Sequence, residues 1–326
     1  MTRFFAVLLA SAICGAAEYK LLDVRKIWDQ APHNAFTDLI YYKGRWICAF
    51  REGAAHVSPD GSIRVIASRD GGKWESAALI GSGAADLRDA KLSIAPDGRL
   101  MLLAAGALHQ PAAAKHESMV WFSSDGGSWT GPVKVGDPNV WLWRVTWNAG
   151  MALGVGYDTM ARGFVRLYRG NRAAKFETLA PSLFERGYPN ESSIVFLPDN
   201  TALCLLRRDE GTRSGQLGRA RPPYTDWTWQ DLGVRIGGPQ MIRLPDGALA
   251  AAVRLYDGKT RTALCSVDAA AGKLKELLTL PSGGDTSYAG MVHRKGVLWV
   301  SYYSSHEGKT SIYLARVRPG TRPRYR

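Results

Sequence analysis

Residues 68–76 read SRDGGKWES and residues 123–131 read SSDGGSWTG, so the pattern Ser-x-Asp-Gly-Gly-x-Trp occurs twice, 55 residues apart. In such a stretch the aspartate can accept hydrogen bonds from the backbone of a turn, the glycines permit tight geometry, and the tryptophan packs beneath. A turn motif that recurs at this distance indicates an internal repeat. We therefore interpret Asp70 and Asp125 as structural residues rather than catalytic ones.

Hairpin turns recur at a similar interval along the whole chain. Each turn joins two runs in which apolar residues alternate with polar ones, which is typical of a β-hairpin. The turns lie 47 to 54 residues apart, at Gly44, Gly98, Gly150, Asn200, Gly247 and Gly296. Further short runs follow each hairpin, and no stretch shows a convincing helical periodicity. About 50 residues and four strands per repeat predict an all-β fold, a six-bladed β-propeller of four-stranded antiparallel blades.

The two ends of the chain are expected to meet in one blade. The sixth repeat ends after its third strand, and residues 19–28, YKLLDVRKIW, have the pattern of the missing fourth strand. A ring closed by this N-terminal strand leaves no exposed sheet edge. In this scheme both heptapeptides fall between the third and fourth strands of a blade, and residues 223–229, PYTDWTW, are a degenerate third copy.

The first residues are expected to direct export. Residues 1–17 contain a basic residue, a short apolar stretch and then small residues, which is typical of a secretory signal peptide. The propeller then occupies residues 18–318, and residues 319–326 form a basic tail. No later run of 18 apolar residues predicts a membrane span. The destination, a periplasm or the outside of the cell, stays open.

Charge and cysteine content exclude several classes of function. The net charge is +13, but no nucleic-acid-binding module is evident, so we interpret the excess as a solvated basic surface and expect no nucleic-acid partner. Cys48, Cys204 and Cys265 remain after the signal peptide and lie in apolar runs, which favours buried free thiols over a disulfide framework. No cluster has metal-ligand spacing, so neither a metal nor another cofactor is expected.

An arginine series suggests an anion site. Arg51, Arg207 and Arg254 each stand seven residues after a hairpin turn, on otherwise apolar second strands, and Tyr303 takes the equivalent place in the sixth repeat. A guanidinium on an apolar strand is costly unless it binds something, and its fork of donors suits a carboxylate. The alternative is that each arginine pairs with a neighbouring acid. For Tyr303, a substrate contact and a place in a solvated loop are both open.

A second series stands where the first strands of three repeats open. It consists of Asp89, Glu191 and Tyr288. A glutamate near a tyrosine can accept the phenol proton and so activate the oxygen as a nucleophile. A neutral nucleophile suits a substrate that carries its own carboxylate, and tyrosine nucleophiles are an exception among retaining glycosidases.

These motifs resemble those of the sialidase superfamily over nearly the whole mature chain. The heptapeptides are similar to its Asp box, Ser-x-Asp-x-Gly-x-Thr-Trp, shortened by one residue. The stretch NESSIVFLPDNTALCLLRRD matches the glutamate that opens the fourth blade and the arginine that follows it, which implies these roles for Glu191 and Arg207. The resemblance likewise implies that Tyr288, in TSYAGM, is the nucleophile and that Arg254 binds the substrate carboxylate.

The resemblance extends to the first two blades with two departures. It implies that Arg51, in AFREG, and Asp89 lie at the substrate. Sialidases begin the first blade with Phe-Arg-Ile-Pro, whereas this chain has PHNAFTDL, with His33 and no arginine. The acid/base aspartate expected after Arg51 is also not evident in EGAAHVSPDGS, where the candidates are Glu52, His56 and Asp60.

The sequence thus predicts an exported, sialidase-like exo-glycosidase that acts on a glycan bearing a terminal acidic sugar. Its proton donor is one of the acids or the histidine between Glu52 and Asp60, or Asp89. The alternative is a propeller that binds a glycan or a protein without turnover, since this fold hosts many functions. The sugar, its linkage and the oligomeric state stay open.

Overall fold

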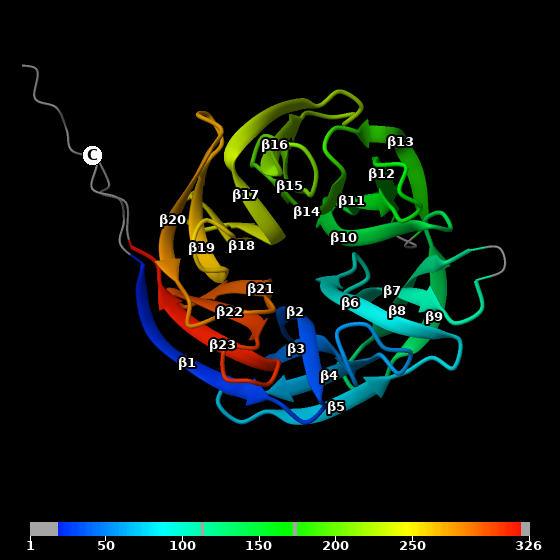
Figure 1. The fold of residues 1–326 in the computed structure, drawn as a ribbon, viewed down its shortest axis with the longest axis vertical. Coiled ribbons are helices and arrows are strands. Elements are labelled where there is room, and N and C mark those ends of the chain that lie inside the picture. The colour runs from blue at the N-terminus through cyan, green and yellow to red at the C-terminus, as the bar shows by residue number, and fades with distance from the viewer. Residues whose placement is uncertain (1–18, 112–113, 172–174, 321–326) are drawn as a thin grey trace, which may run out of the picture.

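The computed structural model describes residues 19–111, 114–171 and 175–320. Within these ranges the chain forms strands, turns and bends, and none of it is helical, so the described part offers no helix that could cross a membrane. The strands form antiparallel sheets arranged like blades around a central axis (Figure 1). The predicted all-β propeller architecture is confirmed at this level. The predicted signal peptide, residues 1–17, and residues 321–326 of the predicted tail lie outside the described residues.

Four sheets have four strands each and a fifth has seven. The first sheet comprises β2 (His33–Tyr42), β3 (Arg45–Gly53), β4 (Ser62–Ser68) and β5 (Glu75–Ile80). The second comprises β6 (Ala85–Ile94), β7 (Leu100–Leu108), β8 (His116–Ser123) and β9 (Thr130–Val135). The third comprises β10 (Val140–Asn148), β11 (Met151–Asp158), β12 (Val165–Gly170) and β13 (Phe176–Phe184). The seven-stranded sheet comprises β14 (Pro189–Phe196), β15 (Ala202–Arg208), β16 (Ser214–Ala220), β17 (Thr228–Arg243), β18 (Leu249–Leu255), β19 (Arg261–Asp268) and β20 (Lys273–Thr279). The last sheet comprises β1 (Lys20–Trp28), β23 (Ser311–Arg318), β22 (Val297–Ser304) and β21 (Thr286–Arg294).

The seven-stranded sheet changes partners within one long strand. The first half of β17 pairs with β16 between Thr228 and Arg235, and the second half pairs with β18 between Ile236 and Arg243. The first half of this strand is therefore the outer strand of the group β14–β16, and its second half is the inner strand of the group β18–β20.

The N-terminal strand closes the ring as predicted. β1 pairs antiparallel with β23, from Lys20 opposite Arg318 to Trp28 opposite Ile312. In Figure 1 these blue and red strands lie side by side. The pairing covers the edge of β23, and β1 becomes the outermost strand of this sheet.

The predicted turns have the geometry that their residues allow. The six turn residues named above all have positive φ, between 61° at Asn200 and 86° at Gly247. In the first heptapeptide, between β4 and β5, Asp70 accepts hydrogen bonds from the backbone N–H of Gly72 and Lys73 at 2.8 and 3.1 Å. The second, between β8 and β9, repeats this pattern around Asp125. The predicted turn role of both aspartates is confirmed.

The degenerate third copy keeps part of this turn. The indole N–H of Trp74 donates to the carbonyl three residues earlier at 3.1 Å, and Trp227 does the same to Tyr224 at 2.9 Å. Tyr224 has a φ of 68°, in the place where the first copy has Gly71 at 76°.

The core lies between neighbouring sheets. One cluster joins Ile47 and Val65 of the first sheet to Leu87 and Leu102 of the second, and similar clusters fill the other gaps. The three cysteines are buried and free, as predicted.

The inner strands share a feature that prepares the site. Each strand nearest the axis has a register shift near its start, for example between Arg88 and Lys91 in β6 and between Ser287 and Gly290 in β21. A bulge of this kind turns a side chain out of the regular alternation. Asp89 and Tyr288 occupy the first bulged position in these two strands, with φ values of 56° and 49°.

Candidate active site

The site centres on a tyrosine–glutamate pair at the axis. The hydroxyl of Tyr288 donates a hydrogen bond to Glu191 Oε1. Arg207 Nη1 donates to the same carboxylate oxygen at 2.8 Å and to the Tyr288 hydroxyl oxygen at 3.2 Å. The backbone N–H of Gly238 holds the other carboxylate oxygen at 2.8 Å. β14, β15, β17 and β21 thus bring together three of the residues expected from the sequence.

The register explains how Glu191 reaches this place. The bulge in β14 lies between Pro189 and Ser192, and Arg207 stands opposite it on β15. Glu191 is the second bulged residue of its strand, whereas Tyr288 is the first of its own. Counted from the hairpin turns, Glu191 and Tyr288 are equivalent, but in the strand registers they differ by one position. Their side chains still converge.

Charge and burial set the resting state of the pair. Burial raises the pKa of Tyr288 well above its usual value, and the negative charge of Glu191 raises it further. Burial disfavours the charged form of Arg207, but attraction to Glu191 and Tyr288 outweighs this and raises its pKa. The phenol is therefore neutral at rest, beside a carboxylate that can take its proton.

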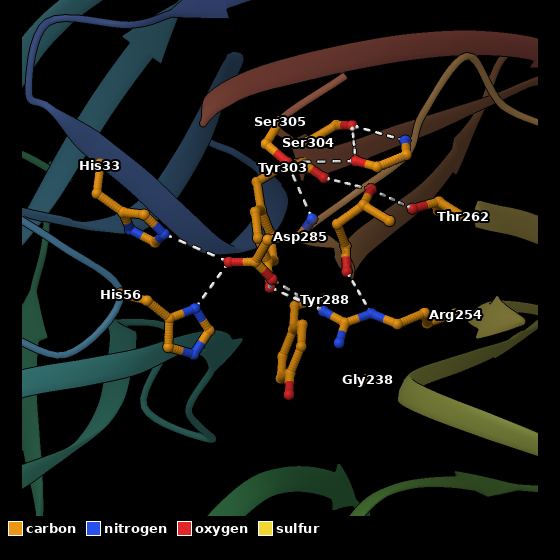
Figure 2. A network of polar contacts seen from close by, with 12 residues as sticks. His33, His56, Gly238, Arg254, Thr262, Asp285, Tyr288, Tyr303, Ser304 and Ser305 are labelled. Atoms are coloured by element: carbon orange, nitrogen blue, oxygen red, sulfur yellow. Dashed lines mark hydrogen bonds and ion pairs between the residues drawn. The ribbon is translucent and has the colours of Figure 1, made fainter. Parts of the chain in front are cut away.

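A second cluster forms around Asp285, a residue that the sequence reasoning missed (Figure 2). One carboxylate oxygen faces His56 Nδ1 at 2.7 Å and His33 Nε2 at 3.3 Å. The other accepts a hydrogen bond from the Tyr303 hydroxyl at 2.7 Å and lies 3.4 Å from Arg254 Nη2.

These contacts keep Asp285 ionised. Burial opposes ionisation, but hydrogen bonds from His33, His56 and Tyr303 outweigh it and lower the pKa far below the usual range. The metal-ligating atoms of the two histidines and of Asp285 lie within 4.8 Å of one another. However, both oxygens of Asp285 already have partners, and His33 Nδ1 lacks the hydrogen-bond partner that a metal-bound histidine usually has. The arrangement therefore fits a hydrogen-bonded cluster better than a metal centre.

Arg254 links the two clusters. Its Nε donates to the carbonyl of Thr286 at 2.7 Å, its Nη2 donates to the Tyr303 hydroxyl at 2.9 Å, and its Cζ lies 5.3 Å from the centre of the Tyr288 ring. Tyr303 is fully buried, so it is not in a solvated loop. Its hydroxyl contacts both Arg254 and Asp285 and orients these two side chains. Arg207 and Arg254 thus both border Tyr288.

Arg51 is not part of this site. This corrects the expected anion site of three arginines, Arg51, Arg207 and Arg254. Its side chain is 0% exposed, with Nε bonded to Asp86 at 2.8 Å and both Nη groups donating to the Ala55–Ser58 loop. Arg51 stands opposite Ala35 as Arg254 stands opposite Gly237, so the backbone positions are equivalent. Both arginines meet a carboxylate at the start of the next inner strand, Asp86 for Arg51 and Asp285 for Arg254. The difference is the Ala55–Ser58 loop, which binds both Nη groups of Arg51 and encloses it in the scaffold.

Glu52 is also a structural residue. It accepts a hydrogen bond from the Trp28 indole at 2.6 Å and one from Arg64 Nε at 3.0 Å. Asp60 accepts the Ala54 backbone N–H at 3.0 Å, as a turn residue would. Of the candidates in this loop only His56 faces the site.

Asp89 and two unpredicted residues complete the surroundings of Tyr288. Burial raises the pKa of Asp89, and its charge in turn contributes to the raised pKa of Tyr288. The Lys91 ammonium lies 4.7 Å from the Trp143 ring centre and 5.9 Å from that of Tyr288. Phe36, at the bulge of β2, contacts Tyr288 and His56 with ring centres 5.3 and 5.1 Å apart. Trp143 is buried, and its ring centre lies 5.5 Å from that of Tyr288, so it is a packing residue beside the site.

Sequence reasoning missed Asp285 although a signal was present. It stands three residues before Tyr288, directly before β21, as Asp86 stands three residues before Asp89 in β6. The four partners of Asp285 were each named from the sequence, but nothing linked them to one another, because they come from β2, β18, β22 and the loop after β3.

Comparison with known proteins gives the fold. No family model and no curated protein matches the chain. A solved structure of a Dyadobacter fermentans protein described as of unknown function is 20% identical, with a TM-score of 0.82 over 93% of this chain and 99% of that chain. The Penicillium chrysogenum α-L-arabinanase is 13% identical, with a TM-score of 0.70 over 90% and 98%. Trypanosoma rangeli sialidase is 10% identical, with a TM-score of 0.67 over 88% of this chain and 55% of that one. At these identities the likeness is one of fold.

Proposed function

We propose that this protein is a glycoside hydrolase with a sialidase-like mechanism, acting on a terminal sugar that carries a carboxylate. The hydrogen bond between Tyr288 and Glu191, shared with Arg207, is the observation that carries this proposal. A buried phenol gains little from such an arrangement for stability alone, but it can become a nucleophile when the adjacent carboxylate takes its proton.

The choice of nucleophile argues for an anionic substrate. Tyr288 is neutral at rest, so it does not repel a carboxylate near the anomeric carbon as an aspartate or glutamate nucleophile would. Arg207 contacts its hydroxyl, Arg254 lies 5.3 Å from its ring centre, and both guanidinium groups provide charge-assisted donors for such a group. Their side chains are each 14% exposed, so a ligand would meet guanidinium groups that are already oriented.

The site differs from the expected arginine triad. With Arg51 in the scaffold and His33 beside Asp285, two arginines remain to hold the acidic group. We infer a substrate whose carboxylate is bound with fewer guanidinium contacts than a three-arginine site provides. Sialic acid, a related nonulosonic acid and a uronic acid all fit this description.

The neighbours on this fold support sugar recognition in general. They include an arabinanase with arabinobiose bound and a sialidase, which act on different sugars. We further infer a six-bladed ring within residues 18–318, in which the seven-stranded sheet counts as two blades that share β17. We also infer that residues 1–17 direct export.

A panel of aryl glycosides tests the proposal. Release of the phenol would be measured for sialosides, other nonulosonic acids, uronosides and neutral sugars, with wild type and Tyr288→Phe. We expect turnover of an acidic glycoside that falls by about 10³-fold or more in the variant, because the nucleophile is lost. Tyr302→Phe, which removes a hydroxyl bonded only to the Pro281 carbonyl, is the matched control and should retain activity.

The alternative of a binding propeller predicts a different result. An acidic glycan would then bind wild type and Tyr288→Phe equally, and neither protein would release phenol from any glycoside. Turnover that survives Tyr288→Phe would contradict the proposed nucleophile directly.

A further inference from the structure

Building on the proposed function, we propose that His56, oriented by Asp285, transfers the proton to and from the departing glycosidic oxygen. The imidazole of His56 then acts as the acid/base group, in the loop where the resemblance to sialidases implies an aspartate.

The hydrogen bond to Asp285 fixes the imidazole in one tautomer. Asp285 is an ionised carboxylate and can only accept, so the 2.7 Å contact is a hydrogen bond donated by His56 Nδ1–H. The remaining ring nitrogen, Nε2, is then the one that exchanges a proton. The half-buried carboxylate of Asp285 thus sets the orientation of the ring and leaves Nε2 free to face a substrate.

His56 is placed to meet a substrate, and the competing residues are not. Its side chain is 49% exposed, whereas that of His33 is 10% exposed. The backbone carbonyl of His56 accepts a hydrogen bond from Arg88 Nη2 at 3.1 Å, which holds the loop over β6. The Phe36 ring lies against both His56 and Tyr288, and Figure 2 shows both rings on one side of the Asp285 carboxylate.

Asp89 is the other acid near Tyr288, but its surroundings differ. Its side chain is buried, Oδ1 has no hydrogen-bond partner among the described residues, and its charge interacts with the buried Lys91. No described partner therefore orients this oxygen as Asp285 orients the ring of His56. His56 is the more exposed group and has a defined tautomer.

The two steps balance with these residues alone. In the first, His56 starts as the imidazolium, with one proton on Nδ1 for Asp285 and one on Nε2. The Tyr288 hydroxyl gives its proton to Glu191, its oxygen bonds to the anomeric carbon, and the leaving oxygen departs with the Nε2 proton, which leaves His56 as the neutral Nδ1–H tautomer. In the second, water attacks the anomeric carbon and gives a proton to Nε2, while the Tyr288 oxygen leaves and recovers its proton from Glu191. One glycosidic bond and one water are consumed, and Tyr288, Glu191 and His56 return to their starting states.

Leaving-group acidity provides the test. His56→Asn keeps an N–H at the position of Nδ1 for Asp285 but has no second nitrogen, so it removes only the exchanging group. On the acidic glycoside that wild type hydrolyses, kcat/KM should fall by about 10²- to 10⁴-fold for alkyl or weakly acidic phenol leaving groups. For the most acidic phenols the loss should shrink to within about tenfold, since such groups leave without protonation. Azide should restore turnover and give a glycosyl azide. His109→Asn is the control, because His109 is exposed and contacts only backbone carbonyls.

Several results would overturn the inference. An equal loss for every leaving group in His56→Asn would show that the residue only positions the loop. A leaving-group-dependent loss in Asp89→Asn, with His56→Asn unaffected, would assign the role to Asp89. Inactivation of wild type by a chelator, reversed by Zn²⁺, would make His56 a metal ligand. Tyr288-dependent turnover in any of these cases would leave the proposed function intact, whereas wild-type silence on the whole panel would remove both.

Discussion

Replacing Lys91 with methionine should stabilise the folded protein at pH 7, and this gain should shrink as the pH rises. Lys91 is buried beside Trp143 and Tyr288, and its ammonium has no hydrogen-bond partner among the described residues. Burial lowers its pKa to about 8, with the nearby charge of Arg144 acting in the same direction.

The size of the effect follows from this pKa. In the folded protein the pKa of Lys91, about 8, lies below the ordinary lysine value of 10.5, so between these values the unfolded chain binds more protons and stability rises with pH. Below pH 8 the folded protein must hold the charged form, which costs about 3 kcal/mol at pH 7 and about 1.5 kcal/mol at pH 9.5. Methionine fills a similar volume without the charge.

Urea unfolding of wild type and Lys91→Met at both pH values measures this difference. The stability advantage of the variant should decrease by about 2 kcal/mol from pH 7 to pH 9.5, while other titrating groups cancel in the comparison. Lys134→Met, which removes an exposed lysine paired with Glu117, should give a difference that does not change with pH. A constant difference for Lys91→Met, or a variant that is less stable at pH 7, would refute the reasoning.

Three further substitutions separate scaffold from site. Arg51→Met should destabilise the fold by about 3 to 5 kcal/mol in urea, because it leaves the carboxylate of Asp86 buried without its partner; an unchanged midpoint would argue against the scaffold role. Gly238→Ala would place a Cβ 3.0 Å from the Tyr288 ring at a φ of 53°, so kcat should fall by about tenfold or more, and the strain of alanine at this φ should lower the free energy of unfolding by about 1 to 2 kcal/mol. Arg254→Lys should raise KM for an acidic glycoside by about 10- to 100-fold and leave that for its carboxamide analogue nearly unchanged, whereas equal losses would deny the arginine a role in carboxylate binding.

Repeats made most of the fold predictable from the sequence. The turns at positions such as Gly44 and Gly247 follow from residues that tolerate positive φ, and the alternating runs beside them fix the hairpins. The closing strand, β1, was predictable because the last repeat lacked its fourth strand. The fused sheet around β17 was not, because nothing in the sequence marks where one strand changes its partner.

The site was predictable where it depends on the repeat and unpredictable where it depends on contacts between repeats. Glu191 and Tyr288 stand near equivalent strand openings, and Arg207 stands seven residues after a turn, so counting from the turns found all three. Arg51 stands at the same position as Arg254, and the Ala55–Ser58 loop that binds its guanidinium makes it structural. Sequence position alone cannot show which groups a guanidinium will meet.

The most direct test of the account is to identify the residue that becomes glycosylated. Wild type would be incubated with a fluorinated acidic glycosyl fluoride of the sugar that it hydrolyses, and the digested protein would be mapped by mass spectrometry. The account predicts a covalent sugar on the peptide that contains Tyr288, and no adduct in Tyr288→Phe. An adduct on Glu191 or Asp89, or hydrolysis that inverts the anomeric configuration, would contradict it.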